Sequence, residues 1–134
     1  MPTDMHAFIA GRFETFISDL ETLVNIDSGS DNLAGVETVA RVLVPRLEAI
    51  GFTTRLKKLG TRGVPCLEAF NTPEKETSDI LFLGHMDTVF PDDEAVKRPF
   101  CVDGGRATGP GVSDMKGGLV LALHTLEALH DAGV

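Results

Sequence analysis

Two short segments carry the residue types and spacings that could support chemistry. In the first, His85 and Asp87 are separated by a single residue and follow the apolar run at 79–84. Side chains two positions apart on a strand project to the same side, and α/β sheets place ligands at the C-terminal ends of covered strands. A carboxylate can hold the second ring nitrogen of a metal-binding histidine. The pair therefore indicates a metal site with His85 as a ligand and Asp87 either behind it or as a ligand itself. The alternative is a polar strand end with a structural role.

The second segment is the glycine-rich run GPGVSDMKGG at 109–118, which contains Asp114. Glycines permit unusual backbone angles and close approach, and a carboxylate at the start of a helix is favoured by the helix dipole. Asp114 is therefore expected at the start of the last helix, where a plain helix cap is the alternative to a functional role. The order of glycines and Lys116 does not fit the phosphate-binding pattern Gly-x4-Gly-Lys-Ser/Thr, which disfavours a phosphate cradle.

The elements that must position these segments can be predicted from the period of the apolar residues. Steps of three and four predict helices, and short apolar runs between turn residues predict strands. The predicted helices cover residues 3–26, 34–50 and 113–131, and the predicted strands cover 52–58, 64–70, 79–84 and 100–102. The last helix is expected to bury Leu119, Ala122, Leu123, Leu126 and Leu129. The continuous apolar run at 79–84 is typical of a strand covered on both faces.

These elements predict an α/β fold in a single domain over residues 1–134. Its centre is expected to be a mixed sheet flanked by helices, with the strand at 79–84 inside it. A covered strand needs neighbours, and the sequence offers few further strand candidates. The sheet is therefore expected to be incomplete in this chain, which makes self-association an expected behaviour.

Composition excludes several classes of function. The 134 residues include 12 basic and 20 acidic side chains, a formal net charge of −8, which argues against nucleic-acid binding. No apolar run approaches the roughly 20 residues that span a bilayer, and residues 1–4 do not open a secretory signal. We therefore expect a cytoplasmic protein without membrane partners.

Together, the two segments resemble a known family. The run LGHMDTV at 83–89 and the run GPGVSDMKGG at 109–118, with 29 residues from His85 to Asp114, look like the two N-terminal signatures of the zinc exopeptidases. That family includes glutamate carboxypeptidases, acetylornithine deacetylases and succinyl-diaminopimelate desuccinylases. The pair Pro99-Phe100 and the order of elements also match. Most relatives have Gly-Arg-Gly where this chain has Gly109–Gly111, and the proline variant, with LHTL at 123–126, is similar to the glutamate carboxypeptidase branch.

The resemblance implies a role for each matching residue. His85 resembles the ligand of one zinc ion, and Asp114 resembles the carboxylate that bridges two zinc ions. Asp87 resembles the catalytic-site residue that orients His85. The resemblance also implies that the peptide bond after Asp114 is cis. Two zinc ions per complete site are implied, with cobalt or another divalent metal as a substitute, and the substrate class is small peptides or N-acyl amino acids.

The similarity covers only about the first third of such an enzyme. The family's general base is the first of two adjacent glutamates, and no such pair occurs in this sequence. The lid domain, which in relatives contributes to substrate binding and to a homodimer, is also absent. We therefore predict a zinc-dependent carboxypeptidase or amidohydrolase that releases a C-terminal amino acid, with glutamate as the first candidate. Activity is expected only in the complete protein. The alternative is a short, non-catalytic metal-binding or interaction protein with a relic site.

Overall fold

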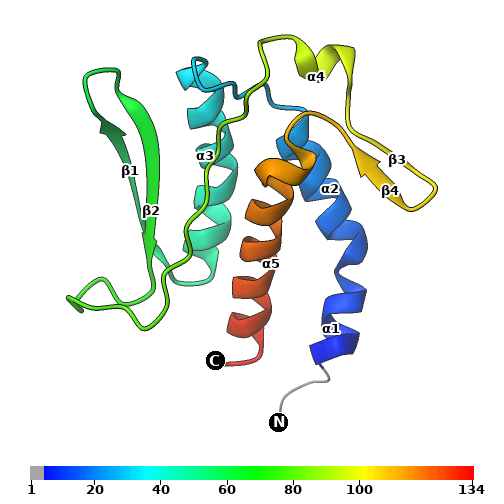
Figure 1. The fold of residues 1–134 in the computed structure, drawn as a ribbon. Coiled ribbons are helices and arrows are strands. Elements are labelled where there is room, and N and C mark those ends of the chain that lie inside the picture. Colours follow the sequence, from blue (N-terminus) through cyan, green and yellow to red (C-terminus); the bar gives the residue numbers. More distant parts are fainter. Residues whose placement is uncertain (1–4) are drawn as a thin grey trace.

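The computed structural model describes residues 5–134, which form a mixed α/β fold built on a layer of helices. Figure 1 shows the long helices α2 (Phe13–Val24), α3 (Leu33–Ala49) and α5 (Gly117–Asp131) side by side, with the hairpin of β1 (Thr53–Leu59) and β2 (Val64–Phe70) against α3. The core lies between the three helices and consists of Leu20, Leu23, Val24, Val39, Leu43, Leu47, Val120 and Leu123. No helix among residues 5–134 has the length and hydropathy needed to cross a membrane.

The first predicted helix is divided in two. α1 (Met5–Gly11) and α2 are separated at Arg12, whose backbone angles of φ −96° and ψ 0° interrupt the helix. Gly11 has low helix propensity, and the interruption lets Arg12 form ion pairs with Glu127 and Asp131 on α5. The predicted start at residue 3 lies outside the described residues.

The second helix and the hairpin form where the sequence predicts them. The Asn32 side chain caps α3 by accepting a hydrogen bond of 2.8 Å from the Gly35 N–H. Pro45 lies inside the last turns of α3. β1 and β2 pair in antiparallel register with Leu56 opposite Leu67, and residues 60–63 form the turn between them.

The remaining elements are short and lie near the site. α4 (Glu94–Lys97) was not predicted from the sequence, and it begins where the Asp27 carboxylate accepts hydrogen bonds from the N–H groups of Asp93 and Ala95. β3 (Cys101–Asp103) pairs with β4 (Arg106–Thr108) in a second small hairpin. A four-residue helix stabilised by a side chain 66 residues away leaves no periodic signal in its own sequence.

The predicted covered strand at 79–84 is not formed within the described residues. This segment has no strand partner, and its side chains are exposed: Leu81 by 74% and Leu83 by 83%. The predicted central mixed sheet is correspondingly not observed, and the two sheets in residues 5–134 are both antiparallel hairpins. The apolar run has the composition of a covered strand, but a strand also needs a neighbouring strand to accept its backbone hydrogen bonds.

Candidate metal centre

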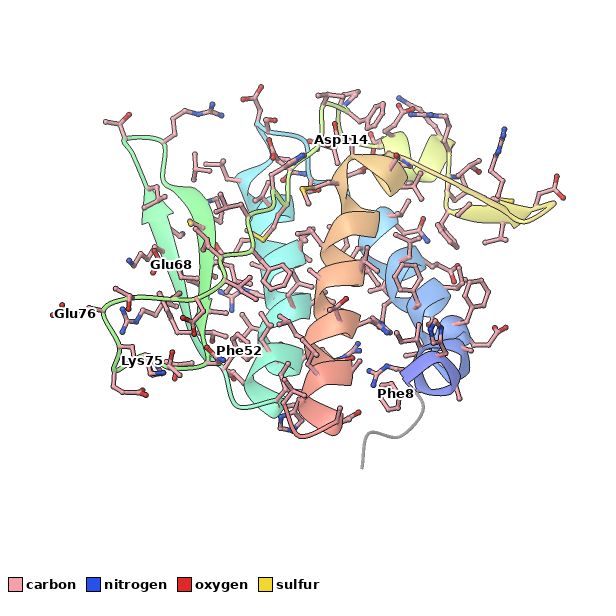
Figure 2. All side chains as sticks on the ribbon, turned by 60° about the horizontal axis from the view of Figure 1, so that its bottom comes forward. Phe8, Phe52, Glu68, Lys75, Glu76 and Asp114 are labelled. Carbon is pink, nitrogen blue, oxygen red and sulfur yellow. The ribbon has the colours of Figure 1, made fainter. Side chains whose placement is uncertain are left out.

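The two segments singled out in the sequence meet at one end of the helical layer. His85 and Asp87 lie in the extended segment that leads to α4, and Asp114 lies in the kinked segment η1 (Val112–Lys116) that precedes α5. Figure 2 shows Asp114 at the end of the layer where α5 begins. The His85 N–H also donates to the sulfur of Met115 at 3.2 Å, which holds the two segments together.

The side chains of the three predicted site residues contact one another in a line. His85 Nε2 is 2.9 Å from Asp114 Oδ1, and His85 Nδ1 is 3.2 Å from Asp87 Oδ1. The backbone oxygen of Asp87 is 3.0 Å from the same Nδ1. Nδ1 of His85 therefore contacts Asp87 while Nε2 faces Asp114. This is the arrangement expected of a metal-binding imidazole whose orientation is fixed by a second residue.

The glycine-rich loop brings Asp114 to this position by an unusual backbone path. Gly111 has φ 75°, and a Cβ added there would lie 2.6 Å from Thr88 Cγ2, so only glycine allows this approach. The Asp114–Met115 peptide bond is cis, as the resemblance implied. The prediction that the last helix begins at Ser113 is wrong: Asp114 and Met115 have non-helical angles, and α5 begins at Gly117.

Lys116, which the sequence analysis used only to reject a phosphate site, anchors this loop. Its side chain is buried, with the residue 1% exposed, and its Nζ donates a 2.5 Å hydrogen bond to the Ile26 carbonyl oxygen after α2. Burial lowers the pKa of Lys116 to about 8, against the opposing attraction of the Asp27 carboxylate. A lysine next to glycines in the sequence suggests a surface, and nothing local signals its burial.

An open pocket of about 300 Å³ lies over the three side chains. Its lining consists of His85, Asp87, Thr88, Val89, Phe90, Gly109, Gly111, Val112, Ser113 and Asp114. The His85 side chain is 47% exposed and that of Asp114 84% exposed, so both can accept a ligand without rearrangement of the fold. The lining combines apolar side chains such as Val89, Phe90 and Val112 with the three ionisable side chains.

The charges around His85 favour a cation at this position. Burial alone would lower the pKa of His85, but the hydrogen bond to Asp114, the bond to the Asp87 backbone and the charges of both carboxylates outweigh it, so the pKa is raised. The same field that favours the imidazolium favours a metal ion in place of its proton. A metal must displace that proton, so its binding is expected to weaken at low pH.

The donor set suits zinc only in part. Imidazole nitrogen and carboxylate oxygen are ligands that zinc accepts, and a catalytic zinc usually has three protein ligands. Within residues 5–134, no group of three or more His, Cys, Asp or Glu side chains is arranged to hold a metal ion. The described residues therefore offer two suitable ligands, His85 and Asp114. Asp87 contacts the other ring nitrogen of His85.

The other histidines lie away from this pocket. His6 on α1 and His130 on α5 are exposed. His124 is buried on α5, where its Nε2 is 2.6 Å from Asp19 Oδ2 and its ring packs edge-on against Phe16. His124 therefore has a packing role, and the apolar stripe predicted for α5 is shifted: Glu127 is buried and Leu129 is 37% exposed.

A histidine and a carboxylate that converge on one pocket, with a second carboxylate against the other ring nitrogen, form an arrangement that also occurs in metal-dependent hydrolases. Residues 81–134 match the family model of peptidase family M20/M25/M40. The chain is also 36% identical over 118 residues to carboxypeptidase G2 of Pseudomonas sp. (strain RS-16), an alignment that covers 88% of this chain. The chain is therefore similar to this peptidase family, and it spans 28% of the length of that curated relative.

Proposed function

We propose that this chain supplies one side of the metal centre of a zinc-dependent carboxypeptidase or amidohydrolase. The observation that carries the proposal is the 2.9 Å separation of His85 Nε2 and Asp114 Oδ1 at an open pocket. In the complete protein His85 would bind one zinc ion, Asp114 would bridge it to a second, and Asp87 would orient His85. The match of residues 81–134 to a peptidase family whose members are generally metal-dependent supports this assignment.

The residues of this chain would bind and orient, and other parts of the protein would complete the reaction. Metal ions held by these residues would supply polarisation of the scissile carbonyl and activation of water. The general base, the further ligands and the substrate-binding lid would come from outside residues 1–134. The proposed reaction is hydrolysis of a peptide or N-acyl amide with release of a C-terminal amino acid. Glutamate is the first candidate because the proline in the run at 109–118, with LHTL at 123–126, resembles the glutamate carboxypeptidase branch.

The test uses the complete protein that contains this chain, purified with zinc and assayed on N-acyl-glutamate and on a matched N-acyl-lysine. Hydrolysis of the glutamate compound that falls to background in His85→Ala and Asp114→Asn is the expected result. His130→Ala, an exposed position on α5, serves as the control and should leave the rate unchanged. Full activity in His85→Ala would contradict the proposal, as would an absence of any amide hydrolysis by the zinc-loaded protein.

The 134-residue chain alone is expected to be inactive. Water activation needs a base and a metal held by three or four ligands, and two ligands fit here. A zinc-dependent turnover of N-acyl-glutamate by the purified chain, lost in His85→Ala, would show that this chain contains more of the site than we propose.

A further inference from the structure

The turn after α2 binds directly to the segment that carries His85 and Asp87. The Thr88 N–H donates to the Ser28 oxygen at 2.8 Å, and the Ser30 N–H donates to the Thr88 oxygen at 3.0 Å. These bonds form a parallel bridge between Gly29 and Thr88. A Cβ at Gly29 would overlap the Phe90 oxygen, so the two backbones are in close contact. The position of Ser30 is therefore fixed relative to the residue that follows Asp87.

The Ser30 hydroxyl is placed on the far side of the Asp87 carboxylate from His85. Ser30 Oγ donates to Asp87 Oδ2 at 2.5 Å, and the Thr88 oxygen is a more distant acceptor at 3.3 Å. The other carboxylate oxygen, Asp87 Oδ1, is the one that lies 3.2 Å from His85 Nδ1. A continuous line of polar contacts therefore runs from Ser30 through Asp87 and His85 to Asp114.

We infer that Ser30 is a positioning residue for the metal centre and acts through Asp87. The first side-chain torsion of an aspartate can take several staggered values and the last torsion is broad, so a carboxylate with one partner can turn away from His85. A hydroxyl that donates to a carboxylate makes a short, charge-assisted bond, and the backbone bonds of the turn hold this hydroxyl in place beforehand. Ser30 thus fixes the oxygen that Asp87 presents to the His85 ring. The expected effect on metal affinity rests on the proposed function. The geometric role of Ser30 does not.

The expected effect is moderate for two physical reasons. Ser30 is exposed, so water competes for the Asp87 carboxylate. The backbone oxygen of Asp87, 3.0 Å from His85 Nδ1, remains as an acceptor when the carboxylate turns away. Loss of a group that contacts a ligand directly typically costs about 10–100-fold in metal affinity. Loss of the Ser30 hydroxyl should cost less, about threefold to tenfold.

The test is a double-mutant cycle on zinc affinity, measured by competition with a chromophoric chelator. The 134-residue chain is compared as wild type, Ser30→Ala, Asp87→Ala and the double variant. Ser30→Ala should weaken zinc binding about threefold to tenfold in the wild-type background and not at all in Asp87→Ala. Ser30→Thr, which keeps a hydroxyl, should restore the affinity, and Ser18→Ala, an exposed serine on α2, should have no effect. An equal loss in both backgrounds, or no loss in Ser30→Ala, would overturn the inference.

A metal-free measurement separates this inference from the proposed function. Three-bond NMR couplings of the Asp87 side chain should report one rotamer in the wild type and in Ser30→Thr, and averaging in Ser30→Ala. If the wild type shows no zinc binding, the proposed metal centre fails for this chain, and the couplings alone decide the role of Ser30. Averaged couplings in the wild type, or an unchanged single rotamer in Ser30→Ala, would overturn it.

Discussion

Two of the histidine–aspartate contacts within residues 5–134 lie in opposite surroundings. His85 and Asp114 are 2.9 Å apart, and the His85 side chain is 47% exposed at the floor of a pocket. His124 and Asp19 are 2.6 Å apart, and the His124 side chain is 8% exposed among α2, α3 and α5. Similar pairs can therefore form an open site or a closed structural contact.

The closed pair is part of a larger set of ion pairs between helices, which we call the interhelical cluster: Arg12, Asp19, Arg46, His124, Glu127 and Asp131. Arg46 binds the two oxygens of Glu127 at 2.6 and 2.9 Å and also contacts Asp19 Oδ2 at 2.9 Å. These partners raise the pKa of Arg46, Glu127 first, although burial opposes the shift. Each carboxylate of the cluster already has at least one basic partner, whereas Asp114 pairs with His85 beside an open pocket and has no second basic partner within residues 5–134. The comparison shows that side-chain exposure beside a pocket, and not the residue type, distinguishes the candidate site from a structural contact.

The largest expected effect on stability comes from the closed region. Glu127→Ala would leave Arg46 and Arg12 without their shared, buried carboxylate, so the free energy of unfolding should fall by about 2–3 kcal/mol, less than for a fully buried pair because Asp19 and water still reach Arg46. Urea denaturation followed by circular dichroism measures this, with the exposed Glu21→Ala on α2 as the control. Equal stability of the two variants would mean that the interhelical cluster is not structural.

The sequence predicted the open region better than the closed one. His85, Asp87 and Asp114 lie in short runs whose glycines and spacing resemble family signatures, and the structure brings all three side chains together. The interhelical cluster depends on partners up to 119 residues apart, and helical periodicity reports only which face is apolar. α3 and the β1–β2 hairpin depend on local periodicity and turn residues, and the sequence predicted them correctly. A strand at 79–84 would depend on distant neighbours, and no strand pairs with it within residues 5–134.

A smaller effect is expected at Lys116, which is buried beneath the open site. Its pKa falls from 10.5 to about 8 on folding through burial. Between these pH values the unfolded chain keeps the proton and the folded chain loses it, so stability should rise with pH in this window. The measurement compares the free energy of unfolding of the wild type with that of Lys116→Met, with a chelator present. The difference, wild type minus variant, should rise by on the order of 2 kcal/mol between pH 8 and pH 10.5. A difference that is flat or that falls with pH would show that Lys116 is not desolvated.

The smallest expected effect is weak self-association through the exposed apolar segment at 79–84. Unpaired backbone and exposed side chains such as Leu81 favour pairing with a second copy. Sedimentation velocity at micromolar concentration should show reversible association that Leu81→Lys reduces. Leu121→Lys, at an exposed leucine on α5, is the matched control. A monomeric wild type, or an equal reduction by the control, would argue against association through this segment.

The central claim is that the open pair binds metal and the closed pair does not, and zinc titration of the metal-free chain tests it directly. We predict micromolar or weaker binding in the wild type, because two ligands leave the ion largely hydrated. Binding should be lost in His85→Ala and retained in His124→Ala. Unchanged binding in His85→Ala, or equal loss in both variants, would contradict the claim. Nanomolar binding abolished by Asp114→Asn would contradict the view that only two ligands are present, and would show that a further group, such as one from a second copy, completes the site.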